Sequence, residues 1–169
     1  RSGRLQDNMG VKFSRKLKRS EVNLIVYDFD GVMTDNRVLV FENGMEAVIA
    51  NRGDGLGIAM IKKMDIPQII LSTEKNQVVF ARAKKLGLEA LHGVDNKLKK
   101  LSEYCQKGGY NPVQVVYVGN DTNDLEAMQF VGLPVAPSDA NEEILKIAKL
   151  ITRAPGGFGV VRELAARIV

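Results

Sequence analysis

The chain has 169 residues, 45% of them hydrophobic and 26% charged, which is enough apolar material for one globular core. Its single cysteine excludes an internal disulfide, and no apolar run approaches the roughly 20 residues that cross a bilayer. We therefore expect a soluble, cytoplasmic protein with no membrane partner.

The net charge of +4 comes largely from the amino-terminal end of the chain. The cations among the first 19 residues face only Asp7; they are Arg1, Arg4, Lys12, Arg15, Lys16, Lys18 and Arg19. We interpret residues 1–21 as a basic leader, either a flexible solvated extension or residues added to the natural protein, and residues 22–169 as the folded domain. A nucleic-acid-binding arm is less favoured, because an anionic small substrate explains the remaining cations equally well.

Short apolar runs alternate with segments of helical periodicity along the rest of the chain. Unalternated runs rich in Val, Ile or Leu, typical of buried parallel strands, predict strands over Val22–Tyr27, Pro67–Leu71, Val113–Val118 and Leu133–Ala136, and a further short strand precedes His92. Helices are predicted over Leu56–Met64, Asn76–Leu86, Lys97–Lys107, Asp124–Val131, Asn141–Lys149 and Phe158–Ile168. This alternation predicts an α/β sandwich with right-handed crossovers.

One segment after the first strand breaks the alternation. Two β-prone runs, Arg37–Phe41 and Met45–Ala50, flank Asn43-Gly44, and Asn-Gly between such runs is a strong hairpin signal. The segment therefore predicts a projecting flap. The other connections are too short to hold a cap domain, so we expect the flap or another subunit to cover the active site.

The first strand ends in a cluster of carboxylates. Asp28 and Asp30 are two residues apart, where alternation places both side chains on one side of an extended chain, and Gly31 lets the backbone turn away. In open α/β sheets ligands bind at this end of the strands. Asp28 can attack phosphorus and bind a divalent metal, while Asp30 can serve as the general acid and base. A calcium loop is excluded, because its sixth and twelfth positions would hold Met33 and Leu39.

Three further loops complete a site if their strands are parallel neighbours. The hydroxyls and amides of Ser72 and Thr73 follow the second strand and can receive phosphate oxygens. Lys97 opens a helix and can neutralise both the phosphate and the nucleophile. The loop from Gly119 to Asp124 can supply oxygen ligands and hold the lysine. Each of these loops alone is weak evidence for an active site.

Taken together, these motifs resemble those of haloacid dehalogenase phosphatases. The motifs are Asp28-x-Asp30-Gly31-Val32-x-Thr34-Asp35, Ser72-Thr73, Lys97, Gly119-Asn120-Asp121-x-x-Asp124 and the closing Pro155-Gly156-Gly157-x-Gly159-x-x-Arg162-Glu163. With the hairpin, they are similar to the cap-less branch that contains 3-deoxy-D-manno-octulosonate 8-phosphate phosphatases and phosphatases of nine-carbon keto-acid sugars. The resemblance covers nearly all of Val22–Val169.

The resemblance implies a Rossmann-like three-layer sandwich, Mg²⁺ as cofactor, and a homotetramer in which flaps form a barrel and a neighbour's residues close each site. It makes Asp28 the nucleophile and a metal ligand, Asp30 the acid and base whose main-chain carbonyl also binds the metal, and Lys97 a catalytic phosphoryl-binding residue. The residues assigned to substrate binding are Thr34, Ser72, Thr73, Glu74, Arg82 and Lys85.

Two positions depart from the octulosonate phosphatase pattern. Asn120 stands where a metal-binding carboxylate is usual, so either its amide oxygen or the carboxylate of Asp121 would ligate magnesium. Glu74 stands where an arginine is common. Arg82 and Lys85 share a face of the next helix and could meet a substrate carboxylate, while Glu74 accepts hydroxyl hydrogen bonds. A surface ion pair is the ordinary alternative for these two cations.

The pattern around Glu74 looks more like the nonulosonate branch. We therefore expect a Mg²⁺-dependent phosphatase that hydrolyses a nonulosonate 9-phosphate, of sialic acid or deaminated neuraminic acid. The first alternative is 3-deoxy-D-manno-octulosonate 8-phosphate hydrolysis. The second is a non-catalytic oligomerisation domain of a sialic acid cytidylyltransferase, which the retained Asp28, Asp30 and Lys97 oppose. The expected partner is a small phosphorylated sugar acid, and no nucleic acid.

Overall fold

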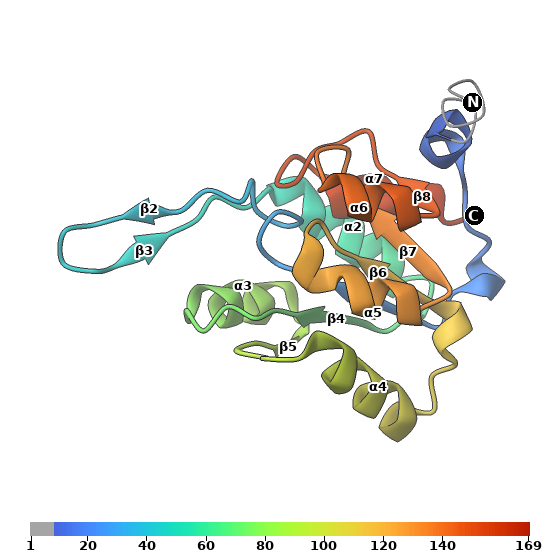
Figure 1. The fold of residues 1–169 in the computed structure, drawn as a ribbon, viewed down its shortest axis with the longest axis horizontal. Helices are drawn as coiled ribbons and strands as arrows, with labels where there is room; N and C mark the ends of the chain where they lie inside the picture. Colours follow the sequence, from blue (N-terminus) through green and yellow to red (C-terminus); the bar gives the residue numbers. More distant parts are fainter. Residues whose placement is uncertain (1–8) are drawn as a thin grey trace.

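The computed structural model describes residues 9–169, in which a parallel sheet lies between two layers of helices (Figure 1). The six strands are, in spatial order, β5 (Glu89–Leu91), β4 (Gln68–Leu71), β1 (Leu24–Tyr27), β6 (Val115–Val118), β7 (Leu133–Ala136) and β8 (Leu150–Ile151). The helices are α2 (Arg52–Lys62), α3 (Val78–Leu86), α4 (Lys97–Gly108), α5 (Leu125–Phe130), α6 (Glu142–Ile147) and α7 (Val160–Arg167). This arrangement confirms the predicted three-layer α/β sandwich.

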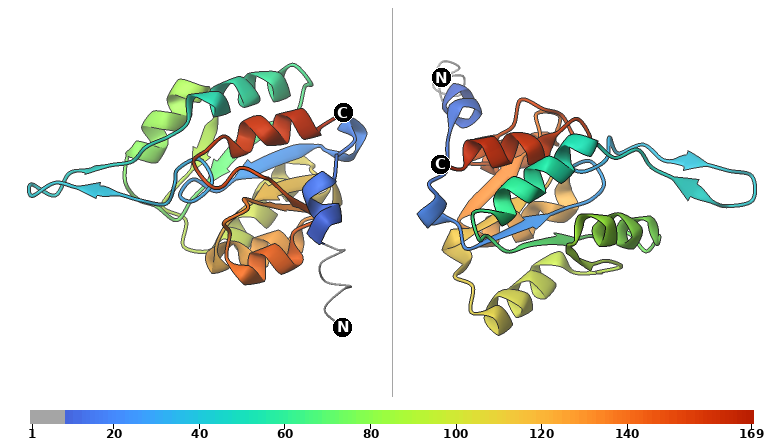
Figure 2. Two further views of the ribbon diagram at one scale, coloured as in Figure 1. Left: turned by 90° about the horizontal axis from the view of Figure 1, so that it is seen from above. Right: turned by 180° about the vertical axis from the view of Figure 1, so that it is seen from behind.

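The central strand β1 is buried on both faces, as its unalternated sequence predicts. Ile25 and Tyr27 pack into one core, with side chains of α2, α3 and α7, and Leu24 and Val26 pack into the other, with side chains of α4, α5 and α6. Figure 2 shows these helices on opposite sides of the sheet. Because β1 pairs in parallel with both β4 and β6, the loops that follow these three strands emerge at one edge.

Helices α2 and α7 approach closely on one side of the sheet. A Cβ at Gly57 would lie 2.7 Å from the Cα of Arg162, so this glycine permits the contact. The buried Asp54 accepts hydrogen bonds from the amides of Val161 (3.1 Å) and Arg162 (3.3 Å) at the start of α7. Burial raises the pKa of Asp54 to about 6, against these two bonds that lower it. These hydrogen bonds hold the start of α7 against α2.

The predicted hairpin is present between β1 and α2. Strands β2 (Leu39–Val40) and β3 (Glu46–Ala47) pair antiparallel and project from the body as a flap, residues 38–48, drawn in cyan in Figures 1 and 2. Gly44 in the turn has a φ of +83°, which explains why Asn-Gly is suited to this position. Apolar side chains on the flap and at its base are largely exposed; they are Val38, Leu39, Val40, Phe41, Met45 and Ile49.

The part of the predicted leader that the structure describes lies against the body. Leu17 is buried and bridges to Ile168, and the side chain of Arg19 donates to the carbonyls of Met64 and Val22. Residues 15–21 therefore pack with the domain. Residues 1–8 lie outside the described part of the chain, and the boundary at residue 21 stays a prediction.

The short strand β8 and the three-residue helices were not predicted. A two-residue strand offers no periodicity to detect, and its pairing with β7 depends on the neighbouring strand. None of the described helices has the length and apolar character needed to span a bilayer.

Candidate active site

A polar cavity of about 260 Å³ opens where β1, β4 and β6 end. Its lining comes from the three loops after these strands and from the base of the flap, namely Asp28, Asp30, Asn36, Ser72, Thr73, Asn120, Asp121, Thr122 and Asn123. The parallel register of β1 with its two neighbours explains why segments so distant in sequence converge here. The convergence of the predicted loops is therefore observed.

The first loop turns sharply after the two carboxylates. Asp28 continues the ladder through its amide, which donates to the carbonyl of Val118 at 2.9 Å, and its Oδ1 accepts from the amide of Phe29 at 2.8 Å. Gly31 has a φ of +78°, and a Cβ there would lie 1.9 Å from Nδ2 of Asn120. Glycine is required at this position both by the backbone conformation and by the close approach of Asn120.

Asp30 lies at the rim of the cavity, half-buried. Thr34 Oγ1 donates to its carboxylate at 3.3 Å and also accepts from the amides of Gly31 and Asn36. Burial raises the pKa of Asp30, and the bond from Thr34 partly opposes that shift. The predicted substrate residue Thr34 is fully buried and does not line the cavity, so in this structure it orients Asp30.

Lys97 is buried between two carboxylates at the start of α4. Its ammonium lies 2.8 Å from Asp28 and 2.7 Å from Asp124. Asp124 also accepts from the hydroxyl of Tyr117 at 2.8 Å and from the amide of Asn120 at 3.0 Å. Both oxygens of this buried carboxylate are therefore hydrogen-bonded. The predicted loop that holds the lysine is therefore in place.

The charges of this cluster do not balance. Burial lowers the pKa of Lys97, but Asp28 and Asp124 together raise it above its ordinary value, so the ammonium stays charged. Burial raises the pKa of Asp28 to about 8, and the charge of Asp124 also raises it, while the charge and the hydrogen bond of Lys97 lower it. One lysine faces two carboxylates, and Asp28 needs additional positive charge to be an anion at neutral pH.

Oxygen atoms beside Asp28 are arranged to receive that charge. One heavy atom of the Asn120 side-chain amide lies 3.0 Å from the carbonyl oxygen of Asp30 and 3.1 Å from Oδ2 of Asp28. As a nitrogen it would donate to both, whereas as an oxygen it completes a group of three oxygens. A carboxylate, a carbonyl and an amide oxygen are ligands that suit Mg²⁺. The described residues hold no cluster of three or more His, Cys, Asp or Glu, so Mg²⁺ would depend on this mixed set.

Asp121, the other predicted ligand, is more exposed. Its Oδ1 accepts from the amide of Thr122 at 2.7 Å, and its side chain begins the short helix Thr122–Asp124. It lines the cavity but is not the residue that meets Asp28.

Ser72 and Thr73 border the same cavity after β4. Ser72 is buried, and its Oγ accepts from the amide of Glu74 at 3.1 Å, which shapes the loop. Glu74 itself lines a second cavity beside Asp30. These three predicted residues are therefore at or next to the site.

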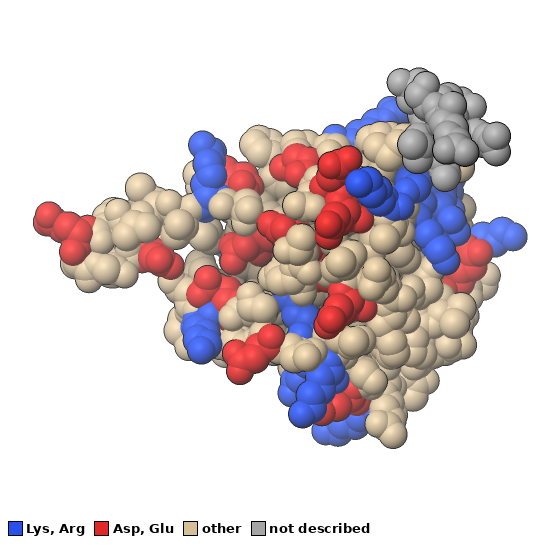
Figure 3. Space-filling model, in the orientation of Figure 1, with Lys and Arg blue, Asp and Glu red and all other residues tan. Residues whose placement is uncertain are grey.

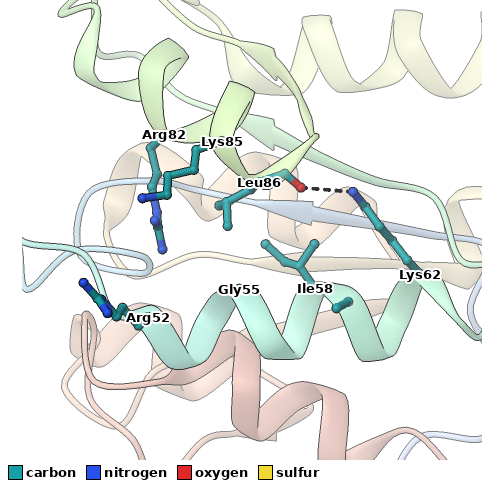
Figure 4. A pocket seen from close by; sticks show the side chains of 8 residues that line it. Arg52, Gly55, Ile58, Lys62, Arg82, Lys85 and Leu86 are labelled. Atoms are coloured by element: carbon teal, nitrogen blue, oxygen red, sulfur yellow. Dashed lines mark hydrogen bonds between the residues drawn. The ribbon is translucent and has the colours of Figure 1, made fainter.

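Arg82 and Lys85 lie elsewhere. They line a cavity of about 490 Å³ between α2 and α3, together with Arg52 and Lys62 (Figure 4). Arg82 donates to the carbonyl of Asn51 at 3.0 Å, and Lys62 donates to the carbonyl of Leu86. The lining contains no carboxylate. The structure therefore does not bring the predicted pair to the catalytic cavity of the same chain.

Asn36 and Glu46 are among the residues at or beside the site that were not predicted. Asn36, with a φ of +66°, lines both the catalytic cavity and its neighbour, and Glu46 of the flap lines the neighbour. The direction in which a projecting hairpin lies has no signal in the sequence, so Glu46 could not be placed.

Comparison with known proteins agrees with this geometry. Residues 55–164 match the family of haloacid dehalogenase-like hydrolases. The 3-deoxy-D-manno-octulosonate 8-phosphate phosphatase of Escherichia coli K12 is 36% identical over 148 residues, which are 87% of this chain and 79% of that protein. The enzyme of the same name from Yersinia pestis is 34% identical, with a TM-score of 0.83 over 87% of this chain and 80% of that one.

Two further solved structures share the fold. A HAD family hydrolase from Streptomyces avermitilis is 44% identical, with a TM-score of 0.89 over 92% of this chain and 90% of that chain. The octulosonate phosphatase of Moraxella catarrhalis, in complex with magnesium, phosphate and the sugar acid, is 29% identical, with a TM-score of 0.83 over 87% of this chain and 85% of that one. The chain therefore belongs to the haloacid dehalogenase-like hydrolases, in the cap-less family of the 3-deoxy-D-manno-octulosonate 8-phosphate phosphatases.

Proposed function

We propose that the protein is a Mg²⁺-dependent phosphatase that removes the terminal phosphate of a 2-keto-3-deoxy sugar acid. The observation that carries this proposal is the contact of buried Lys97 with Asp28, beside three oxygens contributed by Asp28, Asp30 and Asn120. A nucleophile, a fixed cation and a place for a hard metal ion are the requirements of phosphoryl transfer. Such a set is not expected in a purely oligomeric module.

In the proposed mechanism Asp28 attacks phosphorus and forms an aspartyl-phosphate, while Asp30 gives its proton to the leaving sugar oxygen. Asp30 then takes a proton from the water that hydrolyses the intermediate. Ser72, Thr73 and Lys97 hold the phosphoryl oxygens in line. When bound by Asp28, the Asp30 carbonyl and Asn120, with Asp121 as a further candidate ligand, magnesium supplies the positive charge that the cluster lacks.

Two classes of sugar acid, with eight and with nine carbons, remain candidates for the substrate. The names of the relatives favour 3-deoxy-D-manno-octulosonate 8-phosphate. The residues near the site favour a nonulosonate 9-phosphate, because Glu74 beside Asp30 is an acceptor of hydroxyl hydrogen bonds and no arginine follows Thr73. The ratio of kcat/KM for the two phosphates distinguishes them.

We expect turnover of at least one phosphorylated sugar acid in a panel, and we expect a chelator to abolish it and added Mg²⁺ to restore it. The reason is that, without the metal, the counter-charge of Asp28 is Lys97, which Asp28 shares with Asp124. The measurement is phosphate release before and after dialysis against chelator. Full activity without divalent cations would contradict the metal-dependent mechanism, and turnover of none of the phosphates would leave the non-catalytic module as the better proposal.

The substrate carboxylate requires cations that the catalytic cavity does not supply. We propose that Arg82 and Lys85 bind it across a subunit interface, in a homotetramer whose members close one another's sites. Their separation from Asp28 in one chain supports this idea, since they line a different cavity with no carboxylate in it. The exposed apolar flap also favours assembly, because such surfaces are usually covered.

A mixing experiment tests the shared site. Asp28→Asn and Arg82→Ala proteins should each be nearly inactive on the sugar acid, because one lacks the nucleophile and the other the carboxylate partner. Subunits dissociated, mixed and reassembled should regain a substantial fraction of wild-type turnover, since a hybrid pair contains one site with both residues intact. In the control for subunit exchange, the Asp28→Asn protein is mixed with Glu126→Gln, on the exposed side of α5, in place of Arg82→Ala. No recovery, while hybrids are detected by mass, would place Arg82 outside any shared site.

A further inference from the structure

A second cavity, of about 240 Å³, adjoins the catalytic one. Asp30 and Asn36 line both, so the two cavities lie on either side of these residues, at the rim where a leaving group would depart. The second cavity is otherwise bounded by the flap and the start of α3, through Arg37, Val38, Glu46, Val48, Glu74, Asn76 and Val78. A phosphate ester bound at Asp28 would extend its body into this cavity.

The cavity offers carboxylates without cations to neutralise them. Glu46 and Glu74 line it, and within residues 9–169 neither has an ion-pair partner. Its one cation, Arg37, is already bound to Asp35, which accepts from Nε at 2.8 Å and from Nη2 at 2.7 Å. Figure 3 shows acidic side chains on the flap and around its junction with the body. The cavity therefore attracts hydrogen-bond donors and repels anions.

Glu46 is held in position from the body. Asn76 Nδ2 donates to Glu46 Oε2 at 3.1 Å, and the amide of Asn76 donates to Glu74 Oε1 at 2.7 Å. The carbonyl oxygen of the Asn76 side chain accepts from the amide of Val78 at 3.0 Å, which fixes the side chain at the start of α3. In the described chain, the contact with Asn76 is the one hydrogen bond between the flap and the body. Both carboxylates keep an oxygen free for a ligand.

We propose that Glu46 determines specificity, by accepting hydrogen bonds, together with Glu74, from hydroxyl groups on the substrate body. This inference rests on the proposed phosphatase function, since it requires the phosphate to sit at Asp28. It also sets the direction of the substrate. A carboxylate on the substrate cannot lie between two glutamates, so it points out of this cavity, toward cations from another source.

The test compares Glu46→Gln with Glu42→Gln, a variant with the same loss of charge at the exposed tip of the flap. Each is assayed on the best hydroxylated phosphate of a panel and on phenyl phosphate, which has no hydroxyls. We expect Glu46→Gln to lower kcat/KM about tenfold on the hydroxylated ester, mainly through KM, and less than about twofold on phenyl phosphate. Glu42→Gln should change neither.

Equal losses on both esters would overturn the inference, because Glu46 would then act on the flap or on the chemistry. Unchanged kcat/KM on the hydroxylated ester would overturn it as well. A different result would contradict the proposed function: wild-type protein would turn over phenyl phosphate or a hexose phosphate but no sugar acid. In that case the effect of Glu46→Gln is measured on the hexose phosphate and compared with its effect on phenyl phosphate. Gel filtration of Glu46→Gln checks that the assembly is unchanged.

Discussion

Replacing Asp28 by asparagine is expected to lower kcat at least about 10⁴-fold while the protein stays folded. Asparagine keeps the shape of the side chain and can still accept the amide of Phe29, but its amide cannot attack phosphorus or balance Lys97. The loss should appear in kcat on every substrate, phenyl phosphate included. Circular dichroism and a thermal melt report whether the fold is retained.

Asp95→Asn is the matched control for this variant. Asp95 is an exposed carboxylate near the start of α4, and it does not line the catalytic cavity. It should keep wild-type kcat. Phosphate release by Asp28→Asn at more than about one hundredth of the wild-type rate, in protein free of wild-type contamination, would remove the nucleophile assignment. Trapping of labelled phosphate on wild-type protein, and its absence on the variant, supports the covalent step directly.

The sequence predicts the catalytic loops well because each follows a strand with a strong local signal. Leu24–Tyr27 and Val115–Val118 are apolar throughout, and runs of this kind are typical of buried, central, parallel strands. Once β1 lies between β4 and β6, Asp28 must meet the loops at Ser72 and Asn120, whatever the side-chain details. The hairpin is similarly local, since Asn-Gly determines its own turn.

What the sequence does not predict depends on relations between elements. The helix that carries Arg82 is correctly predicted, but its rotation and tilt against α2 direct the guanidinium toward Asn51, and these are properties of packing. The contact of Glu46 with Asn76 joins positions 30 residues apart through the exposed side of a flap. Leu17 has no periodic neighbours, so its burial beside Ile168 becomes visible only when the two ends of the domain meet.

Lys97→Met is expected to lower both activity and stability. Methionine fills a similar volume but leaves Asp28 and Asp124 facing each other in a buried site, and breaking a buried ion pair costs about 3–5 kcal/mol of unfolding free energy. The phosphoryl group also loses its fixed cation, so kcat should fall about 10³-fold. Denaturant unfolding and steady-state kinetics measure the two effects. Lys100→Met, at an exposed position of the same helix, should show neither.

A second substitution separates the two effects of this lysine. Asp124→Asn in the Lys97→Met background removes one of the opposed carboxylates and keeps an acceptor for the amide of Asn120. We expect it to recover part of the lost stability, because only one buried charge remains, but none of the lost turnover. Recovery of both would mean that Lys97 only neutralises Asp124. If only the stability is recovered, the ammonium of Lys97 acts on the phosphoryl group itself. Neutralising Asp124 cannot replace that role.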